Sequence, residues 1–242
     1  MTFRMRWTAF AIVFALFVAA APPAQADEAD EAYAKRTELA SARKARDLWG
    51  EAVRRDPNNF DALWKIARAD YWLGGHVPEK ERMDMFEDGV TRGRAAIALA
   101  ANKPEGHFWL AANMGGAAEA SSRAGVRYRK AIKEELETVL RLDRAFLRGS
   151  ADRALGRWYA RVPRLFGGSK KDAEMHLRAS LTYDPASTSS HYFLAELLLD
   201  DGRKPEARAE AMKVLEAPAD PEWEPENQEF KSQARALLAK LN

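Results

Sequence analysis

Cysteine is absent from the 242 residues of the sequence. Its absence excludes disulfides, thiol chemistry and a lipid attached to an N-terminal cysteine. Histidine is scarce, and the four histidines show no His-Glu-x-x-His spacing, so no metal site is expected. The chain also lacks a Gly-x-Ser-x-Gly elbow, a phosphate loop and a dinucleotide fingerprint. We therefore expect no cofactor and no enzymatic activity.

A large net charge of either sign is also missing, since the formal charge at pH 7 is +2. Such a value is typical neither of a nucleic-acid-binding protein nor of a protein with an acidic tail. We expect no nucleic-acid partner.

Long apolar runs are missing as well, apart from residues 7–21. This run is shorter than the roughly 20 apolar residues that a membrane-spanning helix needs. Two arginines precede it and an Ala-x-Ala sequence at residues 24–26 follows it, which is the pattern of a secretory signal peptide. The alternative is an uncleaved membrane anchor. We expect residues 1–26 to be a signal peptide cleaved after about Ala26, leaving a periplasmic chain of residues 27–242 that neither spans a membrane nor carries a lipid.

Valine, isoleucine and threonine are sparse, whereas alanine, leucine, arginine, glutamate and lysine are abundant. This composition favours helices throughout, and no alternating apolar pattern predicts a sheet. Helix-breaking pairs divide the chain at Asp56-Pro57, Leu73-Gly74-Gly75, Lys103-Pro104, Gly115-Gly116, Phe166-Gly167-Gly168, Asp184-Pro185, Asp201-Gly202 and Ala217-Pro218. We expect inserted loops at about 75–84, 115–125 and 161–170.

The segments between these breakers share two internal patterns. A small, a large and a small residue precede two of the prolines at equal distances, and a leucine or isoleucine followed by a small residue comes after. The first pattern comprises Ala45-Trp49-Ala52 and Ala173-Leu177-Ser180, and the second comprises Ile66-Ala67, Leu110-Ala111, Leu155-Gly156 and Leu194-Ala195. Together they resemble the tetratricopeptide repeat, a pair of helices with a period of 34 residues.

We therefore predict an all-α protein built as a tetratricopeptide-like array of helix hairpins, an α-solenoid. It should form one domain with about four degenerate repeats, and the repeat core should cover about residues 41–218. A C-terminal helix at about 226–241 is expected to cap the stack, because repeat arrays need a polar outer end. Trp49, Trp109 and Trp158 are expected in the core.

Two other features can be interpreted as functional or as structural. The sequence Gly167-Gly168-Ser169 suits an anion-binding nest, but a role for Ser169 as the N-cap of the next helix is favoured. His107 and His191 fall at equivalent positions of two repeats, which favours a packing role over chemistry for both.

Three stretches go beyond the generic repeat in their order and spacing, at residues 106–113, 153–159 and 166–173. They resemble the TatT family, the T-components associated with some tripartite ATP-independent periplasmic (TRAP) transporters. The regulator of microtubule dynamics proteins are similar to the same helical core. The resemblance covers roughly residues 45–218. It implies a periplasmic repeat protein that binds a ligand or a TRAP substrate-binding protein and that can form homo-oligomers. Relatives often begin as lipoproteins, from which this chain departs.

Charge is unevenly distributed: residues 123–171 carry 14 basic and 5 acidic side chains, and residues 172–242 carry 8 basic and 14 acidic ones. Arginines beside aromatic rings suit carboxylates, and TRAP systems mostly carry organic acids. We therefore expect a surface that binds an organic acid or a partner protein. Its residues would be Arg153, Arg157, Arg161, Trp64, Arg68, Tyr71, Phe108, Asn113, Tyr192 and Glu196.

Two alternatives remain open at this point. The basic residues could pair with acidic residues of neighbouring repeats and leave no site for an anion. The protein could also be a general protein–protein interaction scaffold of the cell envelope that binds no small molecule.

Overall fold

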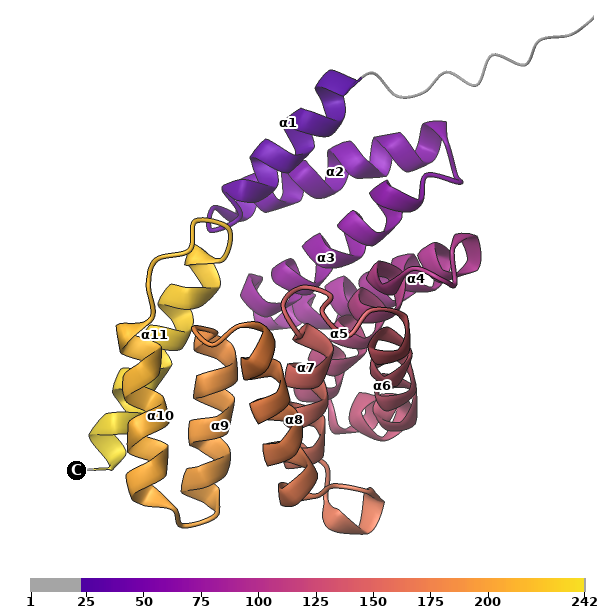
Figure 1. Ribbon diagram of the computed structural model, residues 1–242. Coiled ribbons are helices and arrows are strands. Elements are labelled where there is room, and N and C mark those ends of the chain that lie inside the picture. The colour runs from indigo at the N-terminus through magenta and orange to yellow at the C-terminus, as the bar shows by residue number, and fades with distance from the viewer. Residues whose placement is uncertain (1–22, 242) are drawn as a thin grey trace, which may run out of the picture.

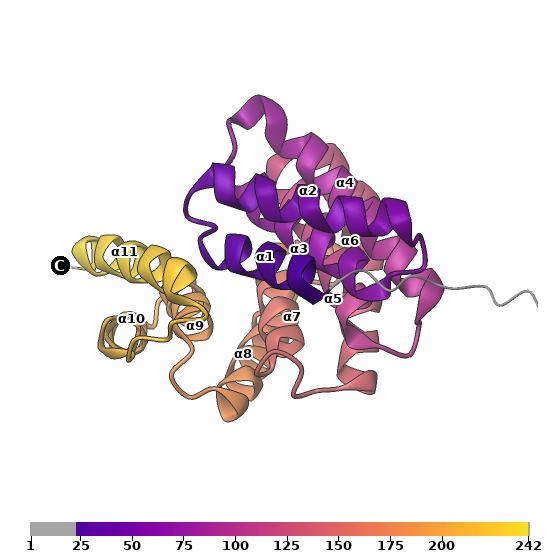
Figure 2. The same cartoon turned by 90° about the horizontal axis from the view of Figure 1, so that it is seen from above.

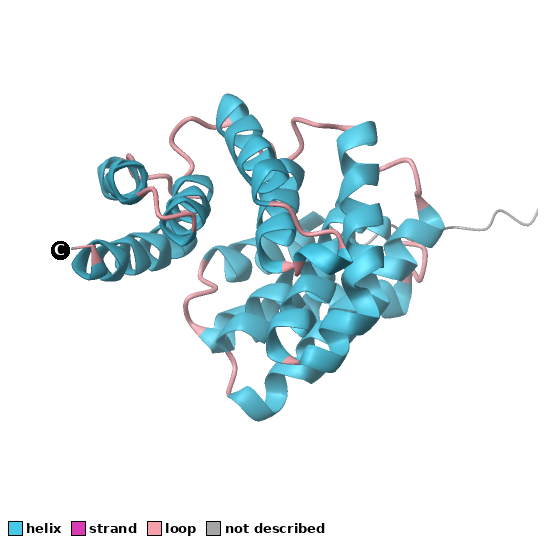
Figure 3. Ribbon diagram, turned by 90° about the horizontal axis from the view of Figure 1, so that it is seen from below, coloured by secondary structure: helices cyan, strands magenta, loops and turns pink. Residues whose placement is uncertain are grey.

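The computed structural model describes residues 23–241, and this part of the chain contains helices but no strand (Figure 3). The predicted all-α fold is thereby confirmed. The elements are α1 (Pro23–Ala34), α2 (Leu39–Arg55), α3 (Phe60–His76), α4 (Glu79–Leu99), α5 (Pro104–Ala120), α6 (Ser122–Leu142), α7 (Ser150–Arg161), the short 3-10 helix η1 (Arg164–Phe166), α8 (Lys170–Tyr183), α9 (Thr188–Asp200), α10 (Lys204–Glu216) and α11 (Glu224–Lys240).

Four helix hairpins form the repeat array, as the sequence predicts. They are α3–α4, α5–α6, α7–α8 and α9–α10. Among the first helices, α3 also packs against α5 and α7 against α9, while α7 meets the second hairpin through α6. Helix α2 packs against α3, while α11 covers α9 and α10 at the other end. Figure 2 shows α9–α11 grouped on one side, α2–α6 on the other, and α7 with α8 between them.

The first helix of each hairpin carries a small residue at one equivalent position, where a neighbouring helix can approach closely. Ala67, Ala111, Gly156 and Ala195 are all buried, and each follows a buried leucine or isoleucine. At Gly156 even a methyl group would meet Leu177 of α8. Small residues at helix contacts let large neighbours fill the space between the backbones.

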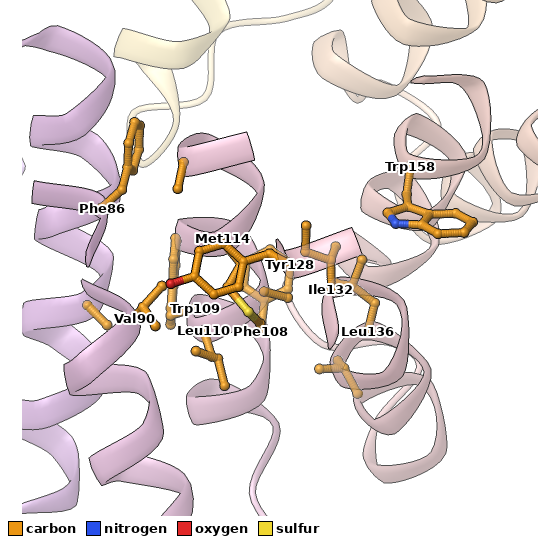
Figure 4. Close-up of a cluster of buried hydrophobic side chains, with 14 of the residues drawn as sticks. Phe86, Val90, Phe108, Trp109, Leu110, Met114, Tyr128, Ile132, Leu136 and Trp158 are labelled. Carbon is orange, nitrogen blue, oxygen red and sulfur yellow. The ribbon is translucent and has the colours of Figure 1, made fainter. Parts of the chain in front are cut away.

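The largest cluster of buried side chains spans the second hairpin and its neighbours. It is drawn in Figure 4, where Phe86 and Val90 of α4 face Trp109 and Met114 of α5. The predicted core positions of Trp49, Trp109 and Trp158 are confirmed, since all three are buried.

The glycine pairs at 74–75 and 115–116 lie inside α3 and α5, so the loops predicted at about 75–84 and 115–125 are wrong. A Cβ atom on Gly74 or on Gly116 would collide with the ring of Phe86. Glycine is required at these positions because a ring of α4 lies between two helices, and not because the chain turns. The repeats exceed 34 residues because α4 and α6 each have 21 residues.

The adjacent Gly115 provides a matched control, since nothing lies within 4 Å of a Cβ atom built there. We expect Gly115→Ala to raise the free energy of unfolding by about 1 kcal/mol, because alanine favours a helix over glycine. Gly116→Ala should instead lower it by about 1–3 kcal/mol through overpacking against Phe86. Chemical denaturation of both variants measures the difference. Equal effects at the two positions would contradict this explanation of the glycine pair.

The loop predicted at about 161–170 is confirmed and contains η1. Ser169 begins α8 as its N-cap, because its side chain accepts a hydrogen bond from the backbone N–H of Asp172. The structural interpretation of the Gly167-Gly168-Ser169 sequence therefore holds.

Three successive hairpins share a polar contact between their two helices at one equivalent position. His107 Nδ1 of α5 lies 2.5 Å from Glu135, and His191 Nδ1 of α9 lies 2.5 Å from Glu210. In α7–α8 the two residue types are exchanged, with Asp152 2.7 Å from Nδ1 of His176. The packing role predicted for His107 and His191 is confirmed, because both are buried and their Nε2 atoms face backbone carbonyl groups.

The carboxylate of Glu210 makes the stability of the fourth hairpin depend on pH. Burial on its own would raise the pKa of Glu210, but hydrogen bonds from His191 and Lys213 outweigh it and lower the pKa to about 2. A carboxyl group whose pKa is lower in the folded than in the unfolded protein stabilises the fold at pH values above its unfolded-state pKa. This stabilisation is lost as the pH falls through the folded-state pKa.

We expect Glu210→Gln to lower the free energy of unfolding by about 2 kcal/mol at pH 7, since hydrogen bonds to a charged group are lost. The difference from the wild type should narrow as the pH falls from the ordinary range of a glutamate, roughly 4.3, to about 2. Urea denaturation at a series of pH values measures it. A difference that is constant with pH would mean that the Glu210 charge plays no part.

The N-terminal predictions fall mostly outside the described residues. The apolar run at 7–21 is not among them, and the expected cleavage point after Ala26 falls within α1. Within residues 23–241 no helix is both long enough and apolar enough to cross a membrane.

Candidate functional site

Side chains from the first helices of the four hairpins lie together on one inner surface, which we call the groove. It comprises Tyr71, Glu119, Arg153, Arg157, Arg161 and Glu196. Its residues converge from separate repeats: Arg157 of α7 reaches Glu119 of α5 at 2.7 Å and Glu196 of α9 at 3.7 Å. Tyr71 of α3 interacts electrostatically with the same Glu119 and Arg157. Since side chains from four hairpins meet here, the groove is the inner side of the array.

Arg157 and Arg161 are neutralised within the chain. Arg157 pairs with Glu119 and Glu196 and lies 4.4 Å from the ring centre of Phe193. Arg161 also pairs with Glu196, at 3.7 Å. Burial, followed by the charge of Glu196, raises the pKa of Tyr192 to about 12. These two arginines therefore pair with acidic residues of neighbouring repeats, as the alternative interpretation of the sequence predicts, although two of the ion pairs are long at 3.7 Å.

Arg153 lies one helical turn before Arg157, and within residues 23–241 its guanidinium group has neither an ion pair nor a hydrogen bond. It is partly buried, and burial lowers its pKa, against the opposing influence of Tyr71 and Asp184. An arginine keeps its charge in proteins in spite of such a shift. The groove therefore contains a partly desolvated positive charge that forms no ion pair or hydrogen bond with a described side chain and that Asp184 stabilises only at longer range.

Tyr71 of α3 is 43% exposed and lies close to the charged residues of the groove. Burial raises its pKa, and the charge of Glu119 raises it further, while the charges of Arg157 and Arg153 lower it. Trp109 lies beneath Tyr71, with 6.0 Å between the ring centres.

Trp64 and Arg68 lie at the end of the groove that α1 covers. The Arg68 guanidinium is 4.1 Å from the ring centre of Tyr33 and 5.2 Å from that of Trp64, and it is 3.7 Å from Asp30. Tyr33 and Asp30 belong to α1. Arg68 is therefore engaged by the N-terminal helix, whereas Trp64 packs beside Arg68 and donates a hydrogen bond of 3.2 Å to Asp61.

Phe108 and Asn113 were predicted to line the site, but the structure buries both. Phe108 packs edge-on against Trp109 and against Phe146 of the α6–α7 connection, which covers it. Asn113 donates hydrogen bonds from Nδ2 to the carbonyl groups of Ala67 and Trp109 at 2.8 Å. Its amide thus joins α5 to α3 and cannot reach a ligand in the groove.

The array closes on itself, because residues far apart in sequence join its first and last helices (Figure 1). Arg36, after α1, forms an ion pair of 2.5 Å with Glu226 of α11 and donates a hydrogen bond of 2.8 Å to the carbonyl of Glu222. His76 of α3 lies 2.6 Å from Glu229 of α11. Sequence patterns show no sign of this contact, since an arginine and a glutamate 190 residues apart carry no local pattern.

A pocket of about 270 Å³ opens beside Arg153. Its walls come from the start of α9 with Ser187, from the α10–α11 connection and from Trp223 and Phe230. The acidic residues Asp184, Asp220 and Glu226 also line it. Asp220 and Glu226 pair with Arg148 and Arg36, both at 2.5 Å, while Asp184 accepts a hydrogen bond from the backbone N–H of Ala186 and raises the pKa of Arg153 through its charge. Within the described residues, Arg153 is thus the arginine of the pocket wall that forms no ion pair, although the carboxylate of Asp184 lies in the same wall.

Comparison with known proteins places the chain in a family. The sequence pattern of regulator of microtubule dynamics protein 1-3 matches residues 25–242, nearly the whole chain. The chain belongs to this family. No curated protein matches the sequence significantly.

Solved structures share the fold of this regulator of microtubule dynamics family member. A thermophilic tetratricopeptide-repeat protein of Thermus thermophilus aligns over 89% of this chain and 99% of its own, with a TM-score of 0.67 and 18% identity. PilF of Pseudomonas aeruginosa aligns over 89% and 93%, with a TM-score of 0.54 and 14% identity. At these identities the likeness establishes the tetratricopeptide-like architecture of the family member and no more.

Because Arg153 forms no ion pair with a described side chain, its replacement by a neutral residue should stabilise the fold. We expect Arg153→Gln to raise the free energy of unfolding by about 0.5–1 kcal/mol, because a desolvated charge without a partner opposes folding. Arg157→Gln is the control and should lower it by about 1 kcal/mol, since it breaks partly buried ion pairs. Thermal and urea denaturation of the ligand-free proteins measure both effects. Destabilisation of the same size by both variants would indicate a structural role for Arg153.

Proposed function

We propose that this family member is a binding protein whose groove holds the carboxylate of an organic acid on Arg153. The observation that carries the proposal is the guanidinium group of Arg153, which lies in the groove beside a pocket and forms no ion pair with a described acidic residue, although Asp184 lines the same pocket. An arginine can donate two parallel hydrogen bonds to one carboxylate. The phenol of Tyr71 and the rings of Trp223 and Phe230 would contact the organic part of the ligand.

The surroundings of Arg153 support an anion more than a neutral ligand. Arg157, one turn away, is already neutralised by Glu119 and Glu196, so its charge would not compete for the ligand. The pocket volume of about 270 Å³ is close to the lower end of the usual range for small-molecule sites, roughly 300–1,000 Å³. A small acid fits this space better than a folded partner does.

The biological setting is a further part of the proposal. An exported protein that acts beside a TRAP transporter, binding its organic acid or its substrate-binding protein, agrees with the signal-peptide pattern at 1–26 and with the TatT-like stretches at 106–113, 153–159 and 166–173. Co-purification with a TRAP substrate-binding protein from the same cell would support this setting. If no substrate-binding protein co-purifies, the TRAP setting loses its support, and acid binding is still tested by the separate measurements described next.

The test of acid binding combines two measurements on the purified protein. A native mass spectrum of the wild type and of Arg153→Gln shows which small molecules co-purify and reports the assembly state. Isothermal titration with a panel of aliphatic and aromatic carboxylic acids then gives affinities. We expect Arg153→Gln to weaken the best acid at least about tenfold, since a charge-assisted hydrogen bond contributes about 1.5–3 kcal/mol.

The matched control is Arg94→Gln, which removes an exposed arginine from α4 outside the groove and should leave the affinity unchanged. Two outcomes would refute acid binding at Arg153: no acid of the panel binds, or the Arg153 and Arg94 variants bind as the wild type does. Capture of an envelope protein together with the absence of acid binding would favour the general scaffold instead.

A further inference from the structure

The connection between α7 and α8, residues 162–169, projects from the body of the array at the end opposite α1 (Figure 1). Its backbone is fixed by several hydrogen bonds. The N–H groups of Phe166 and Gly168 donate to the carbonyl of Pro163 at 2.8 and 3.2 Å, and that of Ser169 donates to the carbonyl of Tyr159 at 3.0 Å. Gly167 has a φ of 101°, which favours glycine. The connection is therefore a turn with a defined backbone conformation.

This turn holds two large apolar side chains in solvent. Leu165 is 87% exposed and Phe166 is 51% exposed. Val126 of α6, at 75%, is another strongly exposed apolar residue. The guanidinium of Arg129 lies 4.5 Å from the ring centre of Phe166, which places the first half of α6 beside the turn. Adjacent apolar side chains held outward by a fixed backbone mark an interaction surface more than scattered exposed residues do.

Basic residues surround these apolar side chains. Residues 157–171 contain five basic side chains and no acidic one, and residues 122–133 likewise contain five and none. The acidic residues that follow on α6, Glu134 and Glu137, pair with Lys130 and Lys133. Within residues 23–241, Arg123, Arg164 and Lys171 have no acidic partner, so positive charge remains free around the apolar side chains.

We propose that this surface, formed by the α7–α8 turn and the first half of α6, docks on the face of a bilayer that contains anionic lipids. Leu165 and Phe166 enter the boundary between headgroups and acyl chains, and Val126 approaches it. Arg123, Arg164 and Lys171 contact the anionic headgroups. Peripheral proteins bind membranes by this combination of buried apolar area and attraction to anionic lipids. The docking concerns a surface separate from Arg153 and does not depend on acid binding.

The test is co-sedimentation of the protein with vesicles of phosphatidylcholine alone and of phosphatidylcholine mixed with phosphatidylglycerol. We expect binding to the anionic vesicles, little to the neutral ones, and a marked loss when the salt concentration is raised, because screening shortens the reach of the charges. The double variant Leu165→Ser/Phe166→Ser should lower the partition coefficient on anionic vesicles at least about tenfold, since two apolar side chains no longer enter the membrane.

The matched control is Leu99→Ser/Met212→Ser, which removes two other apolar side chains, 41% and 42% exposed, from α4 and α10. It should bind anionic vesicles as the wild type does, and thermal unfolding checks that both double variants are folded. The proposal is overturned if the wild type does not bind anionic vesicles or binds neutral vesicles equally well. It is also overturned if the turn variant binds anionic vesicles as well as the control does. That result would indicate a basic surface that suits an acidic protein and does not need Leu165 or Phe166.

Discussion

The close approach of neighbouring helices at one small residue per hairpin is the constraint on which the rest of the structure depends. Ala67, Ala111, Gly156 and Ala195 are buried and leave room for neighbouring helices, and the first helices of the hairpins then lie along the inside of the array. Only with this arrangement can Tyr71, Glu119, Arg157 and Glu196, from four different hairpins, meet in one groove. The contact of Arg36 with Glu226 then joins the two ends of the array.

Most of the buried and half-buried charge of the protein serves this architecture. The contact between His107 and Glu135, and its counterpart between His191 and Glu210, each satisfy polar groups at the interface between the two helices of a hairpin. Arg157 likewise ties α7 to both α5 and α9. Arg153 differs from these residues because it forms no ion pair with a described side chain, and a partly desolvated charge of this kind is more easily explained by a ligand.

The fold could be predicted from the sequence because each hairpin repeats the same short pattern. Leucine or isoleucine followed by a small residue identified the four close contacts, and the C-terminal helix followed from the need for a cap. The glycine pairs led to wrong loop predictions, since glycine at position 116 leaves room for the ring of Phe86 on another helix. Such a contact has no signal in a single sequence.

The groove was predicted less completely than the fold. The sequence predicted Arg153, Arg157 and Arg161 as residues of one binding surface, but whether each charge is paired depends on Glu119 and Glu196 of other repeats. Phe108 was predicted for the same surface, but the α6–α7 connection with Phe146 covers it. The most direct measurement is an arginine side-chain ¹H–¹⁵N NMR titration with the best-binding carboxylic acid, assigned by comparison with Arg153→Gln. We predict a saturable shift of the Arg153 Nε–H signal that exceeds the shift of Arg157. A titration that moves only exposed arginines and leaves the Arg153 signal in place would contradict the account.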